Sequence, residues 1–62
     1  MVAKFLKNVE IADGMRKMRI NEGETLSVAS QNKQFYELRK ENGWETMVPK
    51  SGEGDIYEIL ED

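Results

Sequence analysis

The chain has 62 residues, enough for one small domain, and it contains neither cysteine nor histidine. Disulfides and a Cys/His zinc cluster are therefore excluded, and an apolar core must hold the domain together. Twelve acidic residues against nine basic ones give a net charge of −3, which is not the electrostatic footprint of a nucleic-acid-binding domain.

The first half of the chain alternates apolar and polar residues in short runs separated by turn sequences. Residues 9–11 alternate before Asp13-Gly14, a dipeptide typical of tight hairpin turns. Residues 18–20 continue the alternation and lead into "NEGE", where Gly23 can adopt a positive φ. This half is therefore predicted to form β-strands joined as hairpins.

The second half repeats this pattern. "TLSVAS" at 25–30 and "FYELR" at 35–39 alternate, "WETMVP" at 44–49 returns the chain after a turn, and "IYEILED" at 56–62 supplies a last strand or helical turn. No stretch of about twelve residues has the apolar spacing of a helix. The chain is therefore predicted to be all-β, with five or six short antiparallel strands in a small barrel that fills residues 1–62 as a single domain.

The apolar members of these runs define the predicted core. They are Phe5 or Leu6, Val9, Ile11, Met18, Ile20, Leu26, Val28, Leu38, Val48, Ile56 and Ile59. No apolar run is long enough for a membrane span or a signal peptide, and the lack of cysteine suits a reducing compartment. We therefore predict a cytoplasmic protein without a membrane segment.

The middle of the chain, residues 17–49, resembles a Src-homology-3 (SH3) domain. "KMRINEGETLSVA" at 17–29 matches the family segment "xLSFxxGExLxVL", and "FYELR" at 35–39 matches its paired-aromatic strand. "MVP" at 47–49 matches the "Y-I/V-P" segment that follows a tight turn. The resemblance implies an SH3-like barrel that binds a protein partner through a face carrying aromatic side chains.

The sequence departs from the family where the family binds proline-rich peptides. "KFLKNVEIA" at 4–12 has no tyrosine where the family has "ALYDY", Ile56 aligns where a tyrosine follows the proline, and Thr46 replaces a glycine. Of the family groove, only Phe35 in place of tryptophan and Pro49 remain. Because polyproline helices are recognised by stacked aromatic slots, the resemblance does not extend to proline-rich ligands.

Two aromatic residues are candidates for contact with a partner. Strand alternation places Phe35 on the face opposite Leu38, so it points either towards the groove or over the edge of the barrel. Trp44 follows Gly43 at the tip of a predicted hairpin. It is either an anchor for a partner or a hairpin clasp over the long stems of Lys40 or Arg39.

Three basic residues, Arg16, Lys17 and Arg19, follow the Asp13-Gly14 turn, where the related family loop borders the ligand groove. If that groove is used, they favour an acidic partner. Strand alternation divides them between two faces, so a solvated surface is the alternative. A nucleic-acid-binding barrel that uses the basic N-terminal residues is a further alternative, which the net charge disfavours.

Acidic residues gather at the other end of the chain, in Glu53, Asp55, Glu58 and Glu61. They do not follow the ligand spacing of a twelve-residue calcium loop, so no metal is predicted. As an alternative function, they would mimic a phosphate backbone and block a basic site on a host protein, as a phage-type inhibitor does.

No set of residues supports catalysis. Without histidine, the serines and threonines have no general base of that kind, and so small a barrel offers no pocket that would desolvate a carboxyl group. We therefore predict a non-catalytic module without a cofactor, which binds a protein through Phe35, Trp44, Pro49, Arg16, Lys17 and Arg19. The sequence leaves its oligomeric state open.

Overall fold

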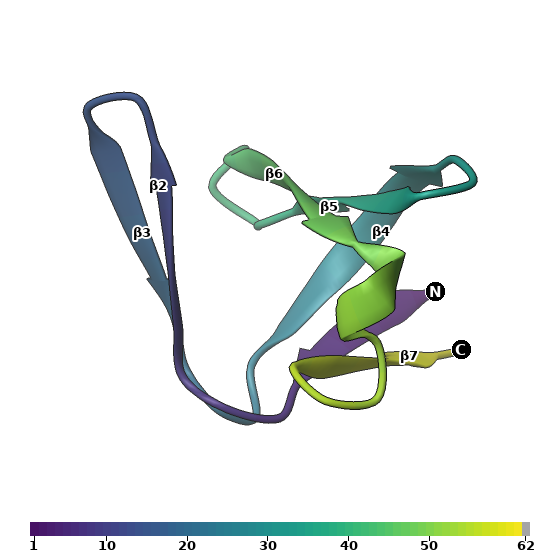
Figure 1. Cartoon of the computed structure of the whole chain (residues 1–62). Helices are drawn as coiled ribbons and strands as arrows, with labels where there is room; N and C mark the ends of the chain where they lie inside the picture. The colour runs from purple at the N-terminus through teal and green to yellow at the C-terminus, as the bar shows by residue number, and fades with distance from the viewer. Residues whose placement is uncertain (62) are drawn as a thin grey trace.

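The computed structural model describes residues 1–61, with the backbone alone for Asp13. Seven strands and one short 3-10 helix follow one another along the chain (Figure 1). They are β1 (Val2–Phe5), β2 (Val9–Asp13), β3 (Arg16–Ile20), β4 (Thr25–Gln31), β5 (Phe35–Arg39), β6 (Glu45–Pro49), η1 (Lys50–Gly52) and β7 (Tyr57–Leu60). The predicted all-β class is confirmed.

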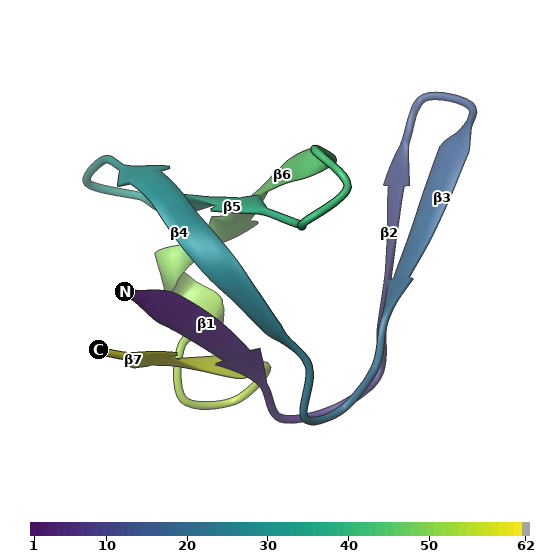
Figure 2. The ribbon, with the colours of Figure 1, turned by 180° about the vertical axis from the view of Figure 1, so that it is seen from behind.

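The strands form two antiparallel sheets. The larger has the order β6-β5-β4-β1-β7, and the smaller is the β2–β3 hairpin, which projects beyond the larger sheet in both views (Figures 1 and 2). Within residues 1–61, no ladder joins β6 to β7 or either sheet to the other. The predicted small barrel is therefore found as an open arrangement of two sheets, in which η1 and the loop after it lie between β6 and β7 along the chain.

The strand count also exceeds the five or six predicted. The additional strand is β1, which pairs with both β4 and β7. Its buried residues are Ala3 and Phe5. Because alanine is small, the alternation Ala3-Lys4-Phe5 gives only a weak apolar signal in the sequence, and the strand escapes a search for apolar runs.

The β2–β3 turn shows why the Asp13-Gly14 dipeptide ends a strand. Gly14 has φ of 62°, whereas Met15 does not have a positive φ. That combination is typical of a two-residue type II′ turn, whose twist matches that of the flanking strands. Met15 at the tip is fully exposed, with a relative accessibility of 103%.

The core lies on the inner face of the larger sheet. Its buried members are Ala3, Phe5, Ile20, Leu26, Tyr36, Leu38, Val48 and Tyr57, and the residues packed partly against them are Val9, Ile11, Met18, Val28, Ile56 and Ile59. Of the predicted alternatives, Phe5 is buried and Leu6 is half-buried. Most of the predicted core is confirmed, and the buried residues outside the predicted list are Ala3, Tyr36 and Tyr57.

Three aromatic rings form the centre of this core. The Tyr57 ring lies 5.7 Å from that of Phe5 and 6.2 Å from that of Tyr36, which it meets edge-on. The hydroxyl of Tyr57 donates to the Pro49 carbonyl at 2.6 Å, and that of Tyr36 donates to Glu53 Oε1 at 2.9 Å. Both buried polar ends are thus satisfied.

Candidate protein-interaction surface

Phe35 and Pro49, predicted as contacts, are brought together by strand pairing. They lie opposite each other in the β5–β6 ladder, and Glu37 lies opposite Met47 one step further on. Alternation puts these four residues on the face opposite Tyr36 and Leu38. The side chains of Phe35, Met47 and Pro49 on that face are called here the Phe35 face.

Met47 is a large and exposed apolar side chain on this face. Its relative accessibility is 52%, whereas Phe35 is half-buried and Pro49 is exposed. An exposed cluster of large apolar side chains is typical of a surface that another molecule covers. In the sequence, Met47 stood out only as part of the "MVP" match. Strand alternation predicts which face a side chain lies on, but it does not predict how much of that side chain neighbouring residues cover.

Two hollows lie between β2 and β6. The first, of about 150 Å³, is almost wholly apolar, and its walls include Val9, Ile11, Met47, Val48 and Pro49. The second, of about 370 Å³, is lined by Ile11, Ala12, Glu37, Glu45, Thr46 and Met47. Since Ile11 and Met47 border both, the hollows adjoin, and the Phe35 face forms part of their rim.

The charges beside these hollows are acidic. Glu45 forms an ion pair with Arg39 at 2.7 Å across the β5–β6 ladder. Within the described residues, Glu37 takes part in no ion pair or side-chain hydrogen bond, although it lines the second hollow. The hollow therefore has one carboxylate that is available to a cation.

Trp44 lies at the opposite end of the β5–β6 hairpin from Phe35. Its backbone is held by the turn, since its N–H donates to Asn42 Oδ1 at 3.0 Å and its carbonyl accepts from Lys40 N–H at 2.8 Å. The indole is half-buried. The structure therefore does not bring Trp44 together with the Phe35 face.

The three basic residues also lie apart from the Phe35 face, on the exposed hairpin strand β3. Lys17 stands opposite Ala12 and Arg19 opposite Glu10, so these two share one face of the hairpin while Arg16 lies on the other. The three basic side chains are thus divided between the two faces of the hairpin, as strand alternation predicted. Arg19 has an acidic residue beside it, which weakens any continuous cationic patch.

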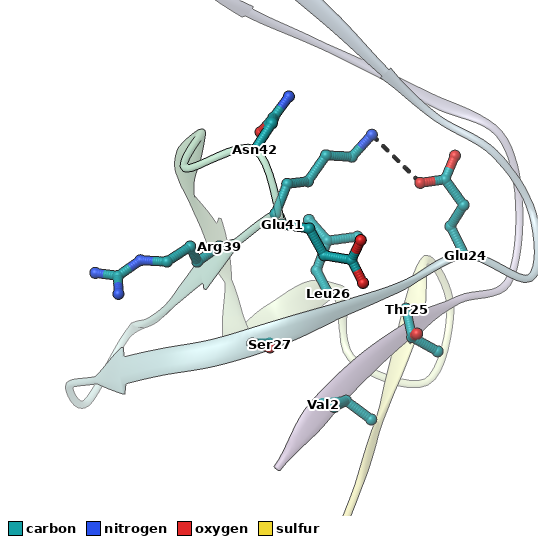
Figure 3. Close-up of a pocket in the computed structure, with 9 residues that line it drawn as sticks. Val2, Glu24, Thr25, Leu26, Ser27, Arg39, Glu41 and Asn42 are labelled. Carbon is teal, nitrogen blue, oxygen red and sulfur yellow. Dashed lines mark ion pairs between the residues drawn. The ribbon is translucent and has the colours of Figure 1, made fainter.

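A third hollow, of about 380 Å³, lies between the start of β4 and the β5–β6 turn (Figure 3). Its prominent feature is an ion pair of 3.3 Å between Lys40 Nζ and Glu24 Oε2. The backbone N–H of Asn21 donates to the other oxygen of Glu24 at 3.1 Å. This N–H first, and then Lys40, lower the pKa of Glu24 below its ordinary value. These charges already have partners, so the contact fastens two turns together.

The acidic C-terminal residues are partly engaged within the chain. Glu53 accepts the hydroxyl of Tyr36, and Asp55 forms an ion pair with Lys7 at 3.1 Å. Among residues 1–61, leaving out the side chain of Asp13, no three acidic side chains gather in a way that could hold a metal ion. In the same part of the chain, no helix is long and apolar enough to cross a membrane.

Comparison of the chain with protein-family models, curated proteins and solved structures found no significant match.

Proposed function

We propose that this chain is a non-catalytic, cytoplasmic protein-binding module of the adaptor or small regulatory kind, which contacts its partner with the Phe35 face. The observation that carries the proposal is Met47, a large apolar side chain that is 52% exposed beside Phe35 and Pro49. Methionine and aromatic side chains are enriched where proteins meet. An apolar hollow adjoins this face and offers a place for a partner side chain.

The proposed likeness to SH3 domains is supported by the elements in which the matching segments fall. Residues 17–29 cover most of β3, the turn after it and the first part of β4, while 35–39 is β5 and 47–49 ends β6. The matches thus follow one another through consecutive strands. The proposal covers an SH3-like strand arrangement and leaves aside the polyproline groove, for which the family tyrosines are missing.

The two alternative functions have weaker support. A mimic of nucleic acid needs free carboxylates, but Glu53 and Asp55 already bind Tyr36 and Lys7. A nucleic-acid-binding module needs a continuous basic surface, but Arg19 stands beside Glu10. A protein partner of the Phe35 face is therefore the function that we propose.

The test is affinity capture from a lysate of the source cells, with identification of the bound protein and measurement of its Kd by calorimetry. We expect Phe35→Ala and Met47→Ala to weaken binding at least about tenfold, because central apolar contacts dominate interface energies. Thr25→Ala, an exposed change on β4, is the matched control and should bind like the wild type.

Trp44→Ala separates the two candidate contacts. If its affinity falls while that of Phe35→Ala does not, the contact lies at the β5–β6 turn. If all variants that remain folded bind like the wild type, the proposal is wrong. Thermal melting of each variant establishes that a loss of binding is not a loss of folding.

A further inference from the structure

β6 is an edge strand, and half of its backbone groups face away from β5. The N–H of Lys50, directly after β6, donates to the carbonyl of Gln34 at 2.8 Å, which places Lys50 in a hydrogen-bonded pair. Hydrogen-bonded and non-bonded pairs alternate along an antiparallel ladder. The backbone groups of Glu45, Met47 and Pro49 therefore face outwards from the sheet.

These outward backbone groups differ in whether they already have a hydrogen-bond partner. Proline has no N–H, and the carbonyl of Pro49 already accepts the hydroxyl of Tyr57. In the described part of the chain, the outward N–H and carbonyl groups of Glu45 and Met47 form no hydrogen bond with another backbone group. Two N–H and two carbonyl groups are thus available at this edge, in the arrangement that another strand recognises.

This free edge faces the two hollows between β2 and β6, which together are called here the β2–β6 slot. Among the described strands β2 pairs with β3 alone, and Figures 1 and 2 show β2 on the side of the hairpin nearest to β6. The slot is apolar around Met47, Val48 and Pro49 and acidic around Glu37 and Glu45. It thus combines unpaired backbone groups, an apolar recess and a free carboxylate.

We propose that the β2–β6 slot binds an extended peptide segment of the partner, which adds to β6 as a further strand. Its backbone pairs with Glu45 and Met47, one apolar side chain enters the smaller hollow, and a lysine or arginine reaches Glu37. The smaller hollow is lined by core residues such as Phe5, Val48 and Tyr57, whereas Glu37 lies on the opposite face of the sheet. Because successive side chains of a strand point to opposite faces, the apolar and basic residues are adjacent in the peptide. This inference rests on the proposed function and names the class of partner.

Charge favours a basic peptide over a second copy of the chain as the occupant. The chain carries a net charge of −3, and the slot holds the carboxylate of Glu37, which has no ion-pair partner among the described residues. A second copy would bring its own net charge of −3 to this edge, and the two like-charged molecules would repel each other.

The first experiment selects from random eight-residue peptides displayed on phage, with the immobilised wild-type chain as bait and Met47→Asp as the counter-selection. We expect enriched peptides to share an apolar residue directly beside a lysine or arginine, without proline at or next to this pair. Absence of enrichment, or enrichment of proline-rich sequences, would overturn the proposal, since proline has no N–H to pair with the edge.

The best enriched peptide is then synthesised and titrated into the isotopically labelled chain, with binding followed by NMR. The expected result is that the amide signals of Glu45 and Met47 shift most, and that N-methylation of the paired peptide residues abolishes binding. Shifts confined to the region around Lys40 and Glu24 would contradict it. Concentration-dependent line broadening of the free chain at Met47 would identify a second copy as the occupant, and would also overturn the proposal.

Glu37→Gln tests the basic contact without removing an apolar group. It should weaken the lysine- or arginine-containing peptide about threefold to tenfold, and leave unchanged a peptide with norleucine at that position. Equal affinities of Glu37→Gln and wild type for the basic peptide would refute the assigned contact. If capture of a partner still depends on Phe35 while no peptide binds the slot, the binding function stands and this inference alone fails.

Discussion

At the scale of single residues, strand alternation predicts the orientation of side chains better than their burial. Phe35 lies on the face opposite Leu38, as its position in β5 predicts. Tyr57 was not predicted as core because Ile56 and Ile59 on either side of it are the more apolar residues. Its burial follows from the register of β7 against β1, which places it opposite Phe5. That register is a contact between distant segments, which local sequence does not encode.

The two core tyrosines predict a loss of stability at alkaline pH. The hydrogen bond to Glu53 raises the pKa of Tyr36, and burial raises the pKa of Tyr57. Because the folded state holds these protons more tightly, their contribution is complete below the ordinary tyrosine pKa of about 10 and disappears as the pH rises through the raised values. Urea unfolding between about pH 8 and 11 should therefore show a smaller decline for Tyr36→Phe than for the wild type. Equal declines would contradict the assigned hydrogen bond.

The lowered pKa of Glu24 predicts a loss of stability at acidic pH. Its lowered pKa means that its contribution is complete above the ordinary glutamate value of about 4.3 and is lost as the pH falls through the lowered value. We expect wild type and Glu24→Gln to converge in stability as the pH falls through this range, measured by urea unfolding. Glu22→Gln, whose exposed side chain lies outside this contact, is the control and should follow the wild type. A constant difference between wild type and Glu24→Gln would rule out the linkage.

At the scale of elements, turns and strands with strong apolar alternation were predictable, and β1 and the sheet edges were not. The Asp13-Gly14 dipeptide and the alternation in β5 encode their structures locally. β1 exists because β4 and β7 pair with its two edges. The Phe35 face could be foreseen in part, since Phe35 and Pro49 were singled out, whereas the slot depends on where the β2–β3 hairpin lies.

The contribution of β5 to stability is tested at Leu38, which is fully buried in the core. Leu38→Ala removes buried methyl groups and leaves a cavity, so it should lower the free energy of unfolding by about 2–5 kcal/mol. Val28→Ala on β4 should cost less, because Val28 is only half-buried beside a register shift in the β4–β5 ladder. Denaturant unfolding measures both. If both substitutions lowered the free energy of unfolding equally, Val28 would contribute as much to the core as Leu38, which would contradict their difference in burial.

At the scale of the whole molecule, the sequence predicted the fold class and not the closure of the sheet. Whether β6 meets β7 depends on the path of the segment 50–56, which has no apolar alternation to indicate it. The ends of the described chain lie close together, because Val2 stands opposite Leu60 in the β1–β7 ladder (Figure 1).

The closeness of the ends predicts that a circular permutant will fold. A short glycine-serine linker would join the two ends, and the chain would be opened between Gly14 and Met15 at the exposed hairpin tip. New ends are tolerated at exposed loop tips, so the permutant should melt cooperatively, although at a lower temperature than the wild type. Opening the chain within β4, between two ladders, should prevent folding. A permutant opened at the tip that fails to fold would contradict the pairing of β1 with β7.

The position of β1 between β4 and β7 also bears on how the protein is made in the cell. Of the strands described, β1 is synthesised before the others, whereas its neighbour β7 is synthesised after all of them. Until then, β1 exposes one unpaired edge, and the Tyr57 ring that completes the aromatic centre is missing. The sheet and its aromatic centre are therefore completed only after β7 has been made, because this pairing joins segments far apart in the sequence.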